Sequence, residues 1–320
     1  MNNTVSESPL KLNYRRTFLI GFAFFGILLL WQVYDSWCPT FLTDIFARRF
    51  YGMSSADLKA SDPNHILHVQ WIVGIIMACD NLAALILLPL FGRLSDRTHT
   101  KIGKRMPFIL FGTGCAVILM NILPLLDNSY AAQPSGFKTA SFVIVLGLLL
   151  VAMGTYRAPA VALMPDVTPK PLRSRANAII NLMGAVGGIL YLGVAAVLYP
   201  NSKTAGLDHV NYQPLFIVVS AIMFVAVAVL LLTIREPKLT AENQALEKQH
   251  PEWNLAQDDG SGHETLPKPV KKSLGFLLAS IALWFIGYNG VTTWFSTYVD
   301  VVMGQGLGGA STCLLIATAG

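Results

Sequence analysis

Seven long apolar stretches dominate the chain, and each is long enough to cross a lipid bilayer. A helix that rises 1.5 Å per residue needs roughly 20 mostly apolar residues to cross a hydrocarbon core of ~30 Å. The stretches cover residues 18–42, 66–91, 106–126, 140–163, 176–199, 214–234 and 274–302. An eighth begins at Leu307, and we expect the chain to be truncated within it, because it stops at Gly320. The sequence therefore predicts an all-α membrane protein.

Composition and the N-terminal region agree with this prediction. The chain is 53% hydrophobic and only 13% charged, with a mean hydropathy of +0.53, which excludes an ordinary soluble domain of 320 residues. The first apolar stretch is longer than the core of a signal peptide and lacks a small-residue cleavage site. We therefore expect it to remain in place as the first helix.

The basic residues predict an orientation in the cell membrane. With a cytoplasmic N-terminus, 17 of the 23 Lys and Arg residues lie in inner segments and 5 in outer loops. Basic residues are retained on the cytoplasmic side, so we expect the N-terminus there. The remaining residue, Arg157, lies inside a stretch. Topology thus accounts for the net charge of +5 without a nucleic-acid partner.

One segment differs from the rest in composition, and it divides the chain. Residues 235–273 are rich in proline and charge and poor in apolar clusters, which predicts a cytoplasmic linker. It separates a six-helix bundle, residues 1–234, from the start of a second bundle, residues 274–320. A faint repeat at an offset of 254 supports two similar bundles. It aligns Trp31, Tyr34, Asp35 and Phe41 with Phe285, Tyr288, Asn289 and Phe295.

The basic loop after the second stretch carries a family resemblance. Gly92-x-x-x-Asp96-Arg97 followed by Gly103-Lys104-Arg105 resembles the signature between helices two and three of the major facilitator superfamily. Four extra residues separate its halves, which is similar to the sucrose transporter and glycoside-pentoside-hexuronide branch. The supporting motifs are Ser95-Asp96-Arg97, Gly103-Lys104-Arg105-Met106-Pro107-Phe108, Tyr156-Arg157-Ala158-Pro159, Met164-Pro165-Asp166 and Arg173-Ser174-Arg175-Ala176-Asn177.

The resemblance implies a major facilitator fold and a function. Such a transporter has roughly twelve helices in two bundles, which rock about a site near the midplane. It implies that the protein moves a sugar, of the sucrose or maltose type, together with protons. Since most of the second bundle would be missing, we expect no transport from residues 1–320 alone.

The same loop predicts a breakable latch on the cytoplasmic side. Gly92 would allow close helix approach, and Asp96 would pair with Arg97 or cap a neighbouring helix. Gly103, Lys104 and Arg105 follow in the same loop and belong to the predicted latch. By analogy with the superfamily's gate, the latch would also include Asp166, Arg173 and Arg175. The alternative is that these charges only set the topology.

Three ionisable residues, Asp35, Asp80 and Arg157, lie well inside the apolar stretches and away from their ends, where they are costly and mark a pathway or a relay. By helix rise, Asp35 lies roughly 20 Å, Asp80 about 18 Å and Arg157 about 10 Å above the inner edge of the core. The hypothesis is that Asp80 carries the proton, Arg157 competes with it or contacts the solute, and Asp35 accepts sugar hydroxyls. Alternatively, Asp35 lies near the outer interface and Arg157 extends to the inner headgroups.

Aromatic and amide side chains accompany these charges and suit a sugar ring. The candidates are Trp31 and Tyr34 on the first helix, and Trp284, Tyr288, Asn289 and Trp294 on the seventh. Aromatic residues near helix ends also form interfacial belts, and Trp294 lies near enough for that alone.

Other classes of function fit less well. We find no His-Glu-x-x-His, Gly-x-Ser-x-Gly or phosphate-loop motif, so we expect neither an enzyme nor a cofactor. The four cysteines show no metal-ligand spacing, and no metal site is predicted. A Na⁺-coupled symporter stays open, because two carboxylates in one layer could ligate a cation. A receptor or scaffold of the same fold is the other alternative.

Overall fold

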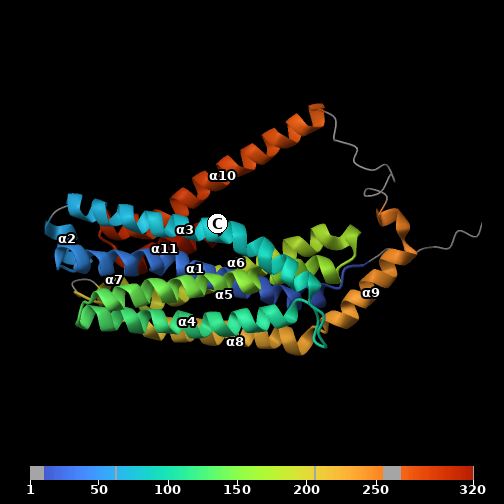
Figure 1. Ribbon diagram of the computed structural model, residues 1–320, viewed down its shortest axis with the longest axis horizontal. Helices are drawn as coiled ribbons and strands as arrows, with labels where there is room; N and C mark the ends of the chain where they lie inside the picture. The colour runs from blue at the N-terminus through green and yellow to red at the C-terminus, as the bar shows by residue number, and fades with distance from the viewer. Residues whose placement is uncertain (1–10, 62, 205–206, 255–267, 320) are drawn as a thin grey trace, which may run out of the picture.

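The computed structural model describes residues 11–61, 63–204, 207–254 and 268–319, and all regular structure in these residues is helical (Figure 1). Seven helices are long and apolar enough to cross a membrane, which confirms the predicted all-α membrane protein. They are α1 (Tyr14–Tyr51), α3 (Pro63–Arg97), α4 (Met106–Ala132), α5 (Gly136–Val167), α6 (Arg173–Leu198), α8 (Gln213–Thr233) and α10 (Lys268–Val301). Each predicted stretch falls on one of them.

Short helices and turns connect or follow the long ones. They are α2 (Ser55–Ser61), α7 (Asn201–Thr204), α9 (Glu236–Gln249), α11 (Gly306–Ala319) and two 3₁₀ turns, η1 (Lys170–Leu172) and η2 (Pro251–Asn254). Capping residues at both ends explain why α1 extends beyond its predicted apolar part. Asn13 accepts a hydrogen bond from the Arg16 amide at 3.0 Å, and Gly52, with φ of 69°, ends the helix.

The long helices α1, α3, α4, α5, α6 and α8 run side by side along the long axis of the molecule (Figure 1). The most extensive contacts join α1 to α6 and α4 to α5. In contrast, α10 leaves the bundle at an angle, and residues 269–291 of this helix are exposed. Its last part contacts α1 and α11, and α11 lies against α6.

Glycines allow the backbones of α1 and α6 to approach closely. A Cβ added at Gly187 would lie 2.6 Å from the Phe25 carbonyl oxygen, and one at Gly21 would lie 2.6 Å from the Met183 side chain. Small residues at such a crossing permit dense packing in a membrane, where apolar surface alone does not hold helices together.

Helix α9 lies within the segment that the sequence predicts to be a linker, and it caps another helix. The backbone amides of Lys104, Arg105 and Met106 donate to the Glu236 carboxylate at 2.9–3.1 Å. These amides form the beginning of α4, whose own N-cap residue supplies no side-chain bond. A carboxylate at this end satisfies unpaired amides and complements the helix dipole.

Three further contacts fix α9 across the ends of α1, α5 and α6. Asn243 donates to the Asp166 carbonyl at 3.2 Å. Glu247 lies 3.1 Å from Arg173, and Glu242 lies 3.9 Å from Arg16. The fully buried residues of α9 are polar, Glu236 and Asn243, and Leu239 between them is only partly buried, so the helix carries a weak apolar signal. Residues 255–267 lie outside the described residues, and the three-part division of the chain stays a prediction.

We expect Gly187→Ala to lower the free energy of unfolding by about 1–3 kcal/mol, because its methyl group would overlap the α1 backbone. Thermal unfolding of the detergent-solubilised protein measures this. Gly193 on the same helix is the matched control, because nothing lies within 4 Å of a Cβ there. An equal loss in Gly193→Ala would mean that the effect is not the α1–α6 contact.

Replacing Glu236 with Ala should destabilise the protein by about 1.5–3 kcal/mol, since charge-assisted bonds to buried amides are lost. The control is Glu242→Ala on the exposed side of α9, where we expect a change within about 0.5 kcal/mol. Both values come from the same thermal unfolding assay. If Glu236→Ala matches its control, the cap does not stabilise α4.

Candidate functional site

A cleft open to solvent lies between α1, α3 and α10, with about 690 Å³ of empty space. Helix α1 contributes Trp31, Tyr34 and Asp35 to it. The other lining residues are Gly74, Met77, Ala78, Asp80 and Asn81 of α3, and Asn289, Gly290, Thr293 and Trp294 of α10.

Two carboxylates line this cleft. Asp80 is buried and Asp35 is half-buried, so both lie at the cleft wall and neither projects into bulk solvent. The Tyr34 hydroxyl donates to the Met77 sulfur at 3.6 Å, which joins α1 to α3 beside them. The two acids that helix rise places at a similar depth therefore line the same cleft.

Arg157 lies behind Trp31. Its guanidinium carbon is 4.7 Å from the centre of the Trp31 ring, a distance typical of cation–π contact. Arg157, Trp31 and Asp80 also line a smaller adjoining cavity of about 270 Å³. All three residues are described, and Arg157 forms no ion pair within 4.0 Å with Asp80 or Asp35. The direct pair considered from the sequence is thus replaced by a contact with an aromatic face.

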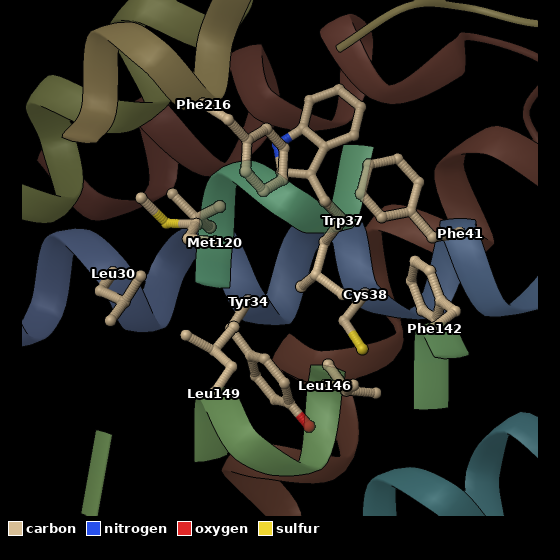
Figure 2. A pocket seen from close by; sticks show the side chains of 12 residues that line it. Leu30, Tyr34, Trp37, Cys38, Phe41, Met120, Phe142, Leu146, Leu149 and Phe216 are labelled. Atoms are coloured by element: carbon tan, nitrogen blue, oxygen red, sulfur yellow. The ribbon is translucent and has the colours of Figure 1, made fainter. Parts of the chain in front are cut away.

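An apolar cavity of about 300 Å³ lies on the other side of Tyr34, between α1, α4, α5 and α8. Figure 2 shows Tyr34 extending from α1 toward Leu146 and Leu149 of α5, with Trp37, Phe41 and Phe216 grouped nearby. The Phe41 ring stacks on Phe216 at 5.8 Å. Tyr34 lines both this cavity and the cleft, so its ring separates an apolar compartment from a polar one.

The structure brings together most of the predicted binding residues. Trp31, Tyr34, Asp35, Asp80 and Asn289 line the cleft, and Arg157 adjoins it. Tyr288 does not line it, because its side chain is exposed and stacks on Trp284 at 5.6 Å.

Sequence reasoning missed the face of α3 that forms the cleft floor. Its residues Gly74, Met77, Ala78 and Asn81 recur at the spacing of one helix face, and this periodicity around Asp80 was the available signal. It also left Trp294 undecided between the cleft and an interfacial belt. Trp294 lines the cleft, and its ring would lie 3.4 Å from a Cβ at Gly74.

The predicted latch forms a compact charged cluster around Arg105, which is buried. Its guanidinium donates to Asp166 at 2.8 Å, to Ser95 at 2.5 Å and to Asp96. Lys104 lies 3.0 Å from the same Asp166 carboxylate. The cluster therefore ties the end of α3 to the start of α4 and the end of α5.

Several details of the predicted latch are wrong. Asp96 pairs with Arg105 and not with Arg97, and both Arg97 and Arg175 are exposed. Because nothing lies within 4 Å of a Cβ at Gly92, this glycine is not a point of close helix approach in the described chain. Its carbonyl instead accepts from Arg105 at 3.4 Å.

Two other predicted residues hold positions beside the cluster. Gly103 adopts φ of 125°, and a Cβ there would overlap the Glu236 carboxylate, so this position requires glycine. Arg173 pairs with Glu247 of α9 and donates to the Thr168 carbonyl, which places it beside the cluster around Arg105 and outside it.

A second charged group lies at the opposite end of the bundle. Ligand atoms of Asp44, Asp127 and His209 lie within 4.8 Å of one another, but Arg48 already pairs with Asp44 at 2.8 Å. Burial lowers the pKa of His209, which favours its neutral form at pH 7. The neighbouring Ser54 hydroxyl and the Arg48 guanidinium hold the pKa of Asp208 below its usual value. This group ties α1 to the loop before α8.

Comparison with known proteins is consistent with this arrangement. The sequence model described as Major Facilitator Superfamily matches residues 63–320. The chain is similar to the sucrose transport protein SUT3 of Oryza sativa subsp. indica, with 32% identity over 40% of this chain and 26% of that protein. It is 35% identical to the sucrose transport protein SUC3 of Arabidopsis thaliana, over 38% of this chain and 22% of that protein.

The sucrose transport protein SUT2 of Oryza sativa subsp. indica is 26% identical over 53% of this chain and 38% of that protein. The matches thus span about a quarter to two fifths of the length of these relatives. The family match covers well over half of the chain, and the long helices and the charged loop agree with it. The chain belongs to the major facilitator superfamily.

Proposed function

We propose that the protein is a secondary active sugar transporter that couples sugar movement to protons by alternating access. The observation that carries the proposal is one cleft lined by two carboxylates, two indole rings and two amides. Indole faces pack against the C–H surface of a sugar ring, while carboxylates and amides accept and donate to its hydroxyls. The relatives named as sucrose transport proteins support a glycoside as the solute.

Within this cleft, Asp80 is the best candidate for the coupling proton. It is buried, it lines both the cleft and the adjoining cavity, and Arg157 lines that cavity with it. A carboxylate at membrane depth is costly when charged, so it favours proton uptake unless a cation approaches. Release of Arg157 from the Trp31 face would let it approach Asp80 and displace the proton. Asp35, which is less buried, is left to bind sugar hydroxyls.

The charged cluster around Arg105 serves as the latch of this cycle. It joins three helix ends on the side of the membrane where α1 begins, which the basic residues predict to be cytoplasmic. The buried Arg105 side chain pairs with both Asp96 and Asp166, so its withdrawal would break both of these ion pairs together. This property suits a gate that has two states.

Asp80→Asn should abolish sugar-dependent proton uptake while sugar exchange at equal concentrations continues. The full-length protein is reconstituted in vesicles. Internal pH and uptake of labelled sugar are then recorded with sucrose, maltose or a monosaccharide outside. Cys79→Ser, an exposed neighbour on the same helix, is the matched control and should behave as the unaltered protein. Asp35→Asn should lose both proton uptake and exchange, because it removes a sugar contact.

Other outcomes of this assay decide between the alternatives. Sugar uptake that requires Na⁺ and leaves internal pH unchanged would contradict proton coupling and favour a Na⁺ symporter. Correctly inserted protein that moves no sugar under either gradient would favour a receptor or scaffold of the same fold. Proton uptake that persists in Asp80→Asn would assign the proton to another group.

A second test addresses the latch. Arg105→Gln removes the buried cation that Asp96 and Asp166 share, and it leaves Asp166 with Lys104 alone. We expect a cysteine placed at buried Ser95 to react at least tenfold faster with a membrane-impermeant maleimide in this variant. Arg175→Gln, an exposed residue near the same ends, is the control and should leave labelling unchanged. Equal labelling in both variants would contradict a latch at Arg105.

A further inference from the structure

A second pocket, separate from the cleft, lies where α1 begins, α8 ends and α9 begins. It encloses about 830 Å³ of space that is open to solvent on one side. The residues that line it are Asn13, Arg15, Arg16, Leu19, Thr233, Ile234, Arg235, Lys238, Leu239 and Glu242. We call it the basic pocket, because four of these residues are cationic and one is acidic.

The positive charge of the basic pocket is largely uncompensated. Glu242 lies 3.9 Å from Arg16 and 3.9 Å from Lys238, so one carboxylate serves two cations at long range. Arg15 and Arg235 form no ion pair with any residue that the structure describes. A pocket with an excess of three positive charges and two free guanidinium groups attracts an anion.

The pocket is also independent of the charged latch, although α9 contributes to both. Glu236 and Asn243 of α9 face α4 and α5, where they bond to the α4 amides and to Asp166. Lys238 and Glu242 lie on another face of α9 and line the basic pocket. Charges in the pocket can therefore be removed without touching the cap or the Arg105 cluster.

The surroundings of the pocket favour a phosphate that carries acyl chains. Leu19, Ile234 and Leu239 line it, and the flanking side chains of Tyr14, Phe18 and Leu232 are exposed, Leu232 by 84%. Exposed apolar residues at the end of a spanning helix contact acyl chains, while basic groups beside them meet headgroup phosphates. One guanidinium group can donate two parallel hydrogen bonds to two oxygens of a phosphate, and Arg15 and Arg235 each offer such a group.

From these contacts we propose that the basic pocket binds the phosphate of an anionic phospholipid in the leaflet where α1 begins. Arg235 and Lys238 from the α8–α9 junction and Arg15 from α1 hold the phosphate. The apolar residues at the pocket's edge hold the first part of the acyl chains. A bound lipid would thereby join the start of α1 to the end of α8.

The test measures thermal unfolding of the detergent-solubilised protein with added lipid. Phosphatidylglycerol should raise the unfolding midpoint and phosphatidylcholine should not. Since each basic residue near an anionic surface strengthens binding by roughly fivefold, Arg235→Gln with Lys238→Gln should raise the phosphatidylglycerol concentration needed for the same midpoint shift by about 25-fold. The matched control removes the same charge at Arg93, in the last turns of α3, and at Lys101, in the loop before α4; both are exposed and neither lines the pocket.

Each outcome decides the proposal. Loss of the lipid effect in the pocket variant, with the control unchanged, supports it, and an equal response in both variants overturns it. A shift produced by glycerol phosphate or inorganic phosphate alone would show that the pocket takes free phosphate, which overturns the lipid assignment. If the double variant does not fold, Arg15→Gln and Lys238→Gln are measured singly, because both side chains are exposed.

Discussion

The hydrocarbon core offers no hydrogen-bonding partners, and this constraint organises the whole chain. Inside it every backbone amide and carbonyl must pair within its own helix, so seven long helices form and only their ends need outside partners. The structure concentrates polar contacts at those ends. Glu236 accepts hydrogen bonds from the first amides of α4, and Arg105, the residue just before this helix, pairs with two carboxylates. The cap of α4 and the proposed latch thus occupy the same small region.

Charged residues deep within the spanning helices are the exception, and Asp35, Asp80 and Arg157 gather around one place. Asp35 and Asp80 lie on α1 and α3, and the cleft between these helices and α10 exposes both to the same solvent-filled space. The Arg157 guanidinium packs on the Trp31 ring and forms no ion pair within 4.0 Å with Asp35 or Asp80, so its charge lies near both carboxylates without neutralising either. An arrangement of unpaired opposite charges around one cavity is costly in a scaffold and useful in a coupled transporter.

The sequence predicted the helices well, because the need to cross the bilayer leaves a strong signal of length and hydropathy. It also found the charges of the cleft and the latch, since ionisable residues stand out in apolar stretches. It did not predict which helix faces meet, so Tyr288 was placed in the cleft and Asn81 was missed. It could not predict the docking of α9, because the fully buried residues of this helix are the polar Glu236 and Asn243 and its apolar contact at Leu239 is only partly buried.

The glycine contacts between α1 and α6 have a mechanical consequence. Gly184 lies against Leu28 and Phe24, and Gly187 against Phe25, so the part of α1 just before Trp31 is seated directly on the α6 backbone. The opposite side of the cleft belongs to α10, most of which is exposed. The α1 wall of the cleft is therefore braced by the α6 backbone, whereas residues 269–291 of α10 have no comparable support among the described residues. Under the proposed function, the braced wall would fix where Trp31, Tyr34 and Asp35 meet a solute.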